Sequence, residues 1–223
     1  MDKILLSFLI AELLFLGTAG GLIGIVVTTK NEMAQTPTPD SAARDLLLMS
    51  SPVTGALING VLVIVAFFLG LPALFFSATR SWMTVHGWSV VICAIFTLVL
   101  GLDVWYHTLQ TRSNLSVMWG EESPRMQSLL QQRFDCCGYL DPATPPFQKD
   151  ATCPNALAAA QKIGCVGAFS NFANGYLNVI FTACFGVVAL DVILLLCIAM
   201  MMKGRKEKER YRNIDQKNGF GGI

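Results

Sequence analysis

The sequence predicts an all-α membrane protein in which four transmembrane helices carry a small disulfide-stapled helical ectodomain between the third and the fourth helix. Hydrophobic residues make up 53% of the 223 residues and charged residues only 14%, whereas soluble chains carry about 25% charged residues. The apolar residues gather in blocks of about 20, the length that crosses the hydrocarbon core of a bilayer. Four of the seven cysteines fall in the longest polar segment.

The apolar blocks divide the chain into spans and connecting segments. The predicted spans are residues 4–27, 53–76, 84–106 and 176–202. The segments around them are an N-terminus at 1–3, a small exposed loop at 28–52, a tight turn at 77–83, a large loop at 107–175 and a basic tail at 203–223. The first block is longer than the core of a signal peptide, which is about 7–15 residues, so it is expected to be retained as a helix.

Positive charge predicts the orientation of the spans. Six Lys or Arg lie within ten residues of the last span, against two in the whole of 28–52. Because Lys and Arg accumulate on the cytosolic side, both termini are expected to be cytosolic in the plasma membrane or an endomembrane. The large loop then faces an oxidising compartment, where its cysteines can form disulfides.

The four loop cysteines are Cys136, Cys137, Cys153 and Cys165. Neighbouring cysteines are poorly placed to pair with each other, so Cys136 and Cys137 are expected to have separate partners. Spacing alone leaves the nested and the crossed pairing open. Zinc is the disfavoured alternative for these thiols, because adjacent cysteines on an oxidising side favour disulfides. Gly138 follows as the predicted turn residue.

Two short helices are expected in the large loop. Ser123 and Pro124 are typical of a helix start, and apolar residues then recur at three- and four-residue intervals as far as Phe134. This helix would deliver the Cys-Cys-Gly turn. A second helical candidate covers residues 156–162 and is stopped by Gly164.

The polar residues of the predicted spans that we single out as candidates are Glu12, Asn59, Asp103 and Asp191. At ~1.5 Å per residue, Glu12 and Asp191 lie about 14 and 18 Å from the cytosolic end of their helices. A lone carboxylate there costs ~2.5 kcal/mol or more, so each is expected to be protonated or paired inward. The favoured interpretation is hydrogen-bonded contact between helices, or a spot that binds a lipid headgroup or a sterol hydroxyl. The alternative is a proton or ion path.

The first span contains two overlapping G-x-x-x-G spacings, made by Gly17, Gly20, Gly21 and Gly24. Small residues one turn apart let helix backbones approach closely in lipid. Packing against another helix of the same chain is the favoured interpretation, and a homo-oligomer face is the alternative.

Two modification sites and a lipid contact are also predicted. Asn114 begins an Asn-Leu-Ser sequon for glycosylation. Cys197 is the candidate for S-palmitoylation, with packing as its equal alternative. The basic tail is expected to bind anionic lipid at ~1 kcal/mol per charge, or only to fix the topology.

Four spans with a large second loop bearing Cys136-Cys137-Gly138, a lone Cys153 and Gly164-Cys165 resemble the tetraspanin family over almost the whole chain. The resemblance implies nested bridges, Cys136 to Cys165 and Cys137 to Cys153. The chain is most similar to fungal tetraspanins associated with host penetration by appressoria, in the stretches Ser41-Ala42-Ala43-Arg44-Asp45-Leu46-Leu47, Cys136-Cys137-Gly138-Tyr139, Thr152-Cys153-Pro154 and the tail from Arg205 to Asp215. It lacks the family's Pro-x-Ser-Cys pattern and a cysteine in the cytosolic turn.

The function expected from this resemblance is that of a membrane organiser that recruits other integral membrane proteins laterally. Residues 139–164 would carry partner specificity. The alternative is a small transporter or channel using Glu12, Asp103 and Asp191. A claudin-like protein is disfavoured, because its disulfide loop follows the first span. No phosphate-cradling glycine loop or paired-histidine spacing indicates an enzyme, a cofactor or a metal, and no basic stripe interleaved with aromatics indicates nucleic-acid binding.

Overall fold

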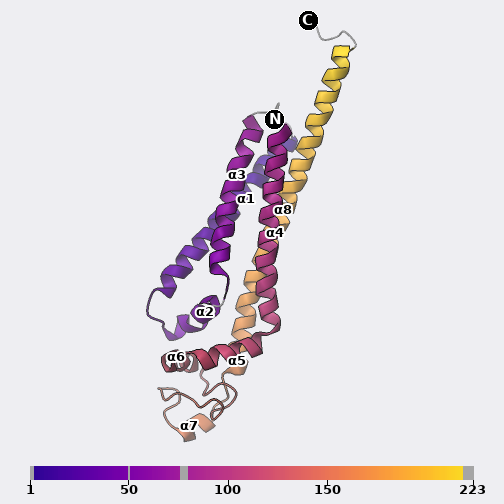
Figure 1. Cartoon of the computed structure of the whole chain (residues 1–223). Helices are drawn as coiled ribbons and strands as arrows, with labels where there is room; N and C mark the ends of the chain where they lie inside the picture. The colour runs from indigo at the N-terminus through magenta and orange to yellow at the C-terminus, as the bar shows by residue number, and fades with distance from the viewer. Residues whose placement is uncertain (1–2, 50, 76–79, 218–223) are drawn as a thin grey trace. The chain divides into compact units, whose positions relative to one another are not determined.

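The computed structural model describes residues 3–49, 51–75 and 80–217, and all regular structure in these ranges is helical. Part of the predicted turn at 77–83 and both chain ends lie outside the described residues. The helices are α1 Lys3–Met33, α2 Pro39–Met49, α3 Val53–Phe75, α4 Arg80–Leu109, α5 Thr111–Glu121, α6 Pro124–Phe134, α7 Ala156–Ala160 and α8 Val166–Lys217 (Figure 1).

Four of these helices are long and apolar enough to cross a membrane. The candidate spans are Lys3–Met33, Val53–Pro72, Ser81–Leu109 and Val166–Lys217. Two disulfides lie between the third and the fourth of them. The predicted fold class, an all-α membrane protein with a disulfide-stapled region before the last span, is therefore confirmed.

The chain divides into two compact units. The first, the bundle unit, consists of Met1–Gly24, Ala56–Leu98 and Phe185–Ile223. The second, the clamped unit, consists of Ile25–Gly55 and Val99–Cys184 and contains both disulfides.

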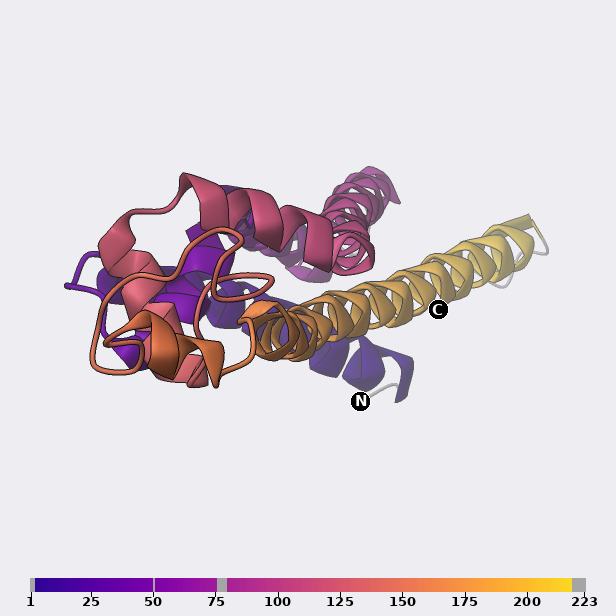
Figure 2. The same ribbon diagram turned by 90° about the horizontal axis from the view of Figure 1, so that it is seen from below.

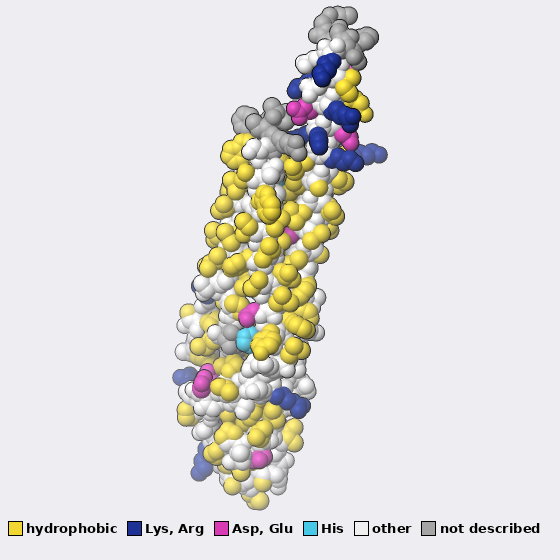
Figure 3. Space-filling view, turned by 45° about the vertical axis from the view of Figure 1, so that its right-hand side comes forward, with side chains coloured by type: hydrophobic (Ala, Val, Ile, Leu, Met, Phe, Trp, Pro, Cys, Tyr) yellow, Lys and Arg dark blue, Asp and Glu magenta, His cyan; other side chains and the backbone are white. Residues whose placement is uncertain are grey.

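The bundle unit is built from parts of α1, α3, α4 and α8 around one apolar core. Phe8 and Phe15 of α1, Val63 of α3, Val90 of α4 and Leu194 of α8 are buried together in it. Large apolar side chains also cover the outside of the same helices, as the yellow atoms in Figure 3 show. A helix that is apolar on all sides is typical of a membrane span, because its outer face meets lipid instead of water.

Among the described residues, the close approaches of helices in the bundle unit do not fall at the glycines of α1. A Cβ atom built at Gly17, Gly20, Gly21 or Gly24 would meet nothing within 4 Å. The close approach of helices occurs instead at Gly60 of α3, where a Cβ would lie 2.8 Å from Cγ1 of Ile23. The structure therefore gives no support to close intrachain packing at these glycines, and both interpretations of the G-x-x-x-G spacings stay predictions.

The small loop at 28–52, expected to be exposed, is largely helical. α1 continues to Met33, and α2 packs against α6 with a buried stripe of apolar side chains. That stripe is Ala42, Ala43, Leu46 and Leu47, which share a core with Leu130 and Tyr139. Thr38 and Pro39 start the helix, since the Thr38 hydroxyl accepts from the backbone N–H of Ser41 at 3.3 Å. The apolar end of the small loop thus packs on the larger loop.

α8 is the longest helix and exceeds the predicted last span at both ends. It begins at Val166 instead of residue 176 and continues through the polar tail to Lys217. Figure 2 shows it as one uninterrupted helix. The predicted span covers only its apolar middle part.

Candidate functional site

The clamped unit places its cysteines at the end of α6, as the sequence predicts. The Ser123 hydroxyl caps the helix by accepting from the N–H of Met126 at 3.3 Å, and Pro124 occupies the first turn. α6 ends at Phe134, and Asp135 adopts a left-handed conformation with φ of 50°. This reverses the chain and delivers Cys136 and Cys137 directly after the helix.

The two disulfides are nested. Cys136 pairs with Cys165 at a Cα–Cα distance of 5.1 Å, and Cys137 pairs with Cys153 at 6.0 Å. These are the pairs that the resemblance implies. A chain-entropy estimate gives each bridge about 3 to 4 kcal/mol of stabilisation for loops of 29 and 16 residues. Residues 139–164 are enclosed by the outer bridge.

Gly138 is required by its backbone conformation and by its surroundings. Its φ of 72° lies in the left-handed region, which residues other than glycine rarely adopt. A Cβ at this position would also collide with the carbonyl oxygen of Asp141. The predicted turn residue therefore allows the chain to fold back tightly after the paired cysteines.

Gln131 of α6 ties the loop to the cysteine turn, and sequence reasoning missed it. The side chain is fully buried. Its Oε1 accepts from the N–H groups of Gly138 at 3.2 Å and Gln148 at 3.0 Å. Its Nε2 donates to the Gln148 carbonyl and to Asp150 Oδ2, both at 2.8 Å. The one available signal was a polar residue on the apolar face of a predicted helix.

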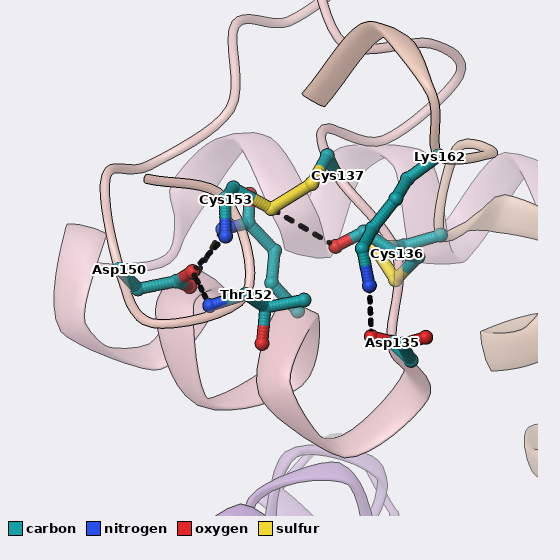
Figure 4. A network of polar contacts seen from close by, with 9 residues as sticks. Asp135, Cys136, Cys137, Asp150, Thr152, Cys153 and Lys162 are labelled. Atoms are coloured by element: carbon teal, nitrogen blue, oxygen red, sulfur yellow. Dashed lines mark hydrogen bonds and ion pairs between the residues drawn. A yellow bond between two sulfur atoms is a disulfide. The ribbon is translucent and has the colours of Figure 1, made fainter. Parts of the chain in front are cut away.

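Asp150 extends this network to the second disulfide. Its Oδ1 accepts from the N–H groups of Thr152 at 2.8 Å and Cys153 at 2.7 Å (Figure 4). Figure 4 also shows the Lys162 ammonium on the carboxylate of Asp135, which joins the end of the loop to the C-cap of α6. The enclosed segment is thus held by polar contacts at both ends as well as by sulfur bridges.

Tyr139 anchors the turn in the core of the clamped unit. Its ring packs against Trp119, with ring centroids 5.6 Å apart, and its hydroxyl donates to the Arg112 carbonyl at 3.1 Å. Burial raises the pKa of this phenol above its usual 10.0, and the Arg112 charge opposes this in part.

Three large apolar side chains of the enclosed loop remain exposed. Leu157 is 76% exposed, Ile163 is 74% exposed and Leu140 is 57% exposed. Leu140 and Ile163 lie on adjacent backbone segments, because Cys137 N–H donates to the Ile163 carbonyl and Val166 N–H to the Tyr139 carbonyl. A contiguous group of exposed apolar side chains is typical of a surface that binds another protein.

The bundle unit pairs Glu12 with a residue that the sequence did not connect to it. Glu12 Oε1 of α1 lies 2.5 Å from His86 Nε2 of α4, and both side chains are buried. His86 Nδ1 lies 3.0 Å from the Ala66 carbonyl oxygen of α3. Glu12 is therefore paired inward, one of the two states expected for it.

The other intramembrane polar residues behave differently from one another. Asn59 donates to the Thr97 hydroxyl at 2.7 Å, which joins α3 and α4. Asp191 is fully buried, and neither carboxyl oxygen has a hydrogen-bond partner among the residues that the structure describes. Asp103 belongs to the clamped unit and is 47% exposed, 3.9 Å from His107 Nε2.

The structure places the two predicted modification sites in partly protected positions. Cys197 is buried in the bundle core, which argues against acylation there, because a thioester-linked chain needs an exposed thiol. Asn114 lies within α5, half-buried, with its Nδ2 3.3 Å from His107 Nδ1. Glycosylation at Asn114 remains a prediction.

In the described ranges, no group of three or more His, Cys, Asp and Glu side chains could hold a metal ion. Comparison of the chain with family models, with curated proteins and with solved structures gives no match.

Proposed function

We propose that this chain is a tetraspanin-like membrane organiser, in which the clamped unit binds partner proteins and the spans keep them together in the membrane. The observation that carries the proposal is the rigid frame around residues 139–164. Two nested disulfides and the Gln131 network hold this segment while it exposes Leu140, Leu157 and Ile163. A loop on a rigid scaffold is a common location for binding specificity.

The proposal includes a location and an orientation. Both termini are cytosolic, the clamped unit faces outward, and the membrane is the plasma membrane or an endomembrane. The charge asymmetry between the tail and residues 28–52 supports this orientation. Disulfides in the clamped unit support it independently, because they persist on the oxidising side. Lateral partners are other integral membrane proteins, and surrounding lipids are sterol or anionic lipid.

The resemblance to fungal tetraspanins extends the proposal to host penetration. A fungal strain that lacks its own penetration tetraspanin provides the assay. Expression of this chain should restore penetration, and a variant with residues 139–164 replaced, Cys153 retained, should not. Equal restoration by both would contradict a role for the loop in that process.

Leu157 and Ile163 provide a more specific test of partner binding than replacement of the whole loop. We expect Leu157→Ser combined with Ile163→Ser to abolish co-purification of partners after crosslinking in mild detergent, while delivery to the surface is unchanged. The matched control is Ala143→Ser with Ala151→Ser, since both alanines are exposed in the same loop. Loss in the control as well, or no loss in either variant, would count against the loop surface.

A second candidate function is a small transporter, and the buried Glu12–His86 pair is the observation that favours it. A titratable pair within the spans could carry a proton. This candidate requires proton flux through the reconstituted protein that disappears with Glu12→Gln. Absence of flux in the unaltered protein would leave the organiser as the function.

A further inference from the structure

The polar tail of the chain is a continuation of α8, and its charges are therefore fixed in space. Residues 203–217 hold seven basic residues, Lys203, Arg205, Lys206, Lys208, Arg210, Arg212 and Lys217, against three acidic ones, Glu207, Glu209 and Asp215. The helix runs through all of them without interruption. Figure 1 shows this yellow end of α8 continuing past the ends of α1, α3 and α4, and Figure 3 shows dark blue side chains gathered on it.

Helical periodicity sorts the charges onto different faces. Residues that are three, four or seven apart lie on one side of a helix. The residues that satisfy this spacing and line one shallow groove are Lys206, Glu209, Arg210, Asn213, Ile214 and Lys217. We call these six residues, three of them basic and one acidic, the basic face. Lys208 and Arg212 are directed to the opposite side of the helix by the same periodicity.

The length of the helix limits what a membrane surface can reach. At ~1.5 Å per residue, Arg210 lies about 10 Å beyond Lys203 and Lys217 about 21 Å beyond it. Charges are screened over about 8 Å at physiological ionic strength. If the helix continues along the direction of its span, lipid headgroups therefore attract its first turn, whereas the outer half of the basic face lies beyond the reach of their charge.

An apolar residue lies among these charges. Ile214 is 42% exposed and lies between Arg210 and Lys217 in the sequence. At ~1.5 Å per residue it is about 17 Å along the helix beyond Lys203. We propose that the basic face is a docking site for an acidic segment of a soluble cytosolic protein that places one apolar side chain on Ile214. This site goes beyond the lateral partners of the proposed function, because it would connect the protein to the cytosol.

The test uses the full chain in nanodiscs of zwitterionic lipid and a soluble fluorescent peptide as the probe. The peptide is helical, rich in Glu, and carries Leu on one face. We expect Lys206→Glu with Arg210→Glu to weaken binding about tenfold or more, since two attractive charge contacts become repulsive. Lys208→Glu with Arg212→Glu makes the same change of net charge at the same spacing and should weaken binding by about threefold or less.

The apolar contact has its own measurement. Ile214→Ser should weaken binding of the Leu-bearing peptide and leave a peptide with Ser in place of Leu unaffected. The exposed Tyr211, tested as Tyr211→Ser, is the control. Circular dichroism checks that each variant keeps its helix, and Ile214→Ser stays informative if the charge variants lose it.

Two results would overturn the proposal. Equal weakening by both charge variants would mean that the tail acts only through its net charge. Quenching of a fluorophore at Asn213 by headgroup-labelled lipid, seen only with phosphatidylserine in the nanodisc, would mean that an anionic membrane is the occupant. Because none of these measurements depends on the clamped unit, their failure leaves the proposed lateral function untouched.

Discussion

Glu12 Oε1 lies 2.5 Å from His86 Nε2, and this contact joins α1 to α4 where neither side chain reaches solvent. His86 Nδ1 faces the Ala66 carbonyl at 3.0 Å. A carbonyl can only accept, so Nδ1 carries a proton. The contact places the imidazole against the carboxyl group, which offsets part of the cost of burying both polar side chains in the spans.

Removal of one member of this pair should destabilise the bundle. We expect His86→Leu to lower the free energy of unfolding by about 3 kcal/mol or more, because it leaves the Glu12 carboxyl buried without a partner. Thermal unfolding in detergent, followed by circular dichroism, measures the loss.

The double variant Glu12→Leu with His86→Leu is the control for this prediction. Its loss of unfolding free energy should be smaller than the sum of the losses of the two single variants. The reason is that two apolar side chains replace both polar partners, so neither polar group is left buried alone. Strictly additive losses would show that the contact is not an energetic pair.

Two glycines of the bundle unit should respond differently to the same substitution. A Cβ at Gly70 would lie 2.9 Å from His86 Cε1 and 3.3 Å from Glu12 Oε1, whereas one at Gly17 would meet nothing within 4 Å. We expect Gly70→Val to lower unfolding stability by about 1–3 kcal/mol, because the tied histidine cannot move aside. Gly17→Val should leave it unchanged.

Gly17→Val has a second readout. If copies of this chain associate through the open glycine face of α1, this variant should lower crosslinked dimer in the membrane without changing unfolding. Equal destabilisation by both valine variants would mean that Gly17 is packed after all.

Gln131 should be the most sensitive polar residue of the clamped unit. Gln131→Ala removes four hydrogen bonds and leaves Asp150 and the backbone of Gln148 short of partners. Since each buried orphan group costs about 1–3 kcal/mol, we expect faster hydrogen exchange in residues 148–153 of the full chain. The exposed neighbour, tested as Gln132→Ala, should leave exchange in this segment unaltered. Similar exchange in both variants would contradict the network.

The sequence was sufficient for features that depend on local chemistry. Ser123 and Pro124 predict the start of α6, and the cysteine turn follows where Phe134 ends it. Hydropathy predicts four spans because crossing a bilayer imposes a length and a composition on each helix. Family resemblance, and not spacing, supplied the nested pairing of the bridges.

Features that depend on which helix faces meet could not be predicted. Glu12 and His86 are 74 positions apart in sequence, and no local pattern connects them. The glycine spacings of α1 suggest a packing face, but Gly60 and Gly70 of α3 make the close approaches. The helix α2 could have been predicted from the sequence, since Ala42, Ala43, Leu46 and Leu47 recur at helical intervals. The helical structure of the polar tail could not be predicted, because a solvated helix and a coil have similar composition.

Asp191 provides a test of whether the bundle holds a ligand. It is fully buried, and its carboxyl oxygens have no hydrogen-bond partner in the described part of the chain. Asp191→Asn keeps the shape of the side chain, so without a ligand it should change unfolding stability by less than about 1 kcal/mol. A larger loss, measured by thermal unfolding in native lipid, would indicate that a bound lipid or ion uses this carboxyl. Asn59→Ala is the comparison, because it breaks the bond to Thr97 and should be destabilising in any lipid.

Tyr139 should make the clamped unit sensitive to alkaline pH. Burial raises the pKa of its phenol above the usual 10.0, despite the opposing charge of Arg112. Because the folded pKa exceeds the unfolded one, the stabilisation from the neutral phenol is fully present below about pH 10 and is lost as pH rises through the folded value. Tyr139→Phe removes this titration but also the bond to the Arg112 carbonyl, so it should cost about 1 kcal/mol at neutral pH and show a smaller alkaline loss. Ultraviolet titration of tyrosinate measures the shift, with Tyr211→Phe as the exposed control. If the two phenylalanine variants remove tyrosinate signal over the same pH range, Tyr139 is not buried in the folded protein.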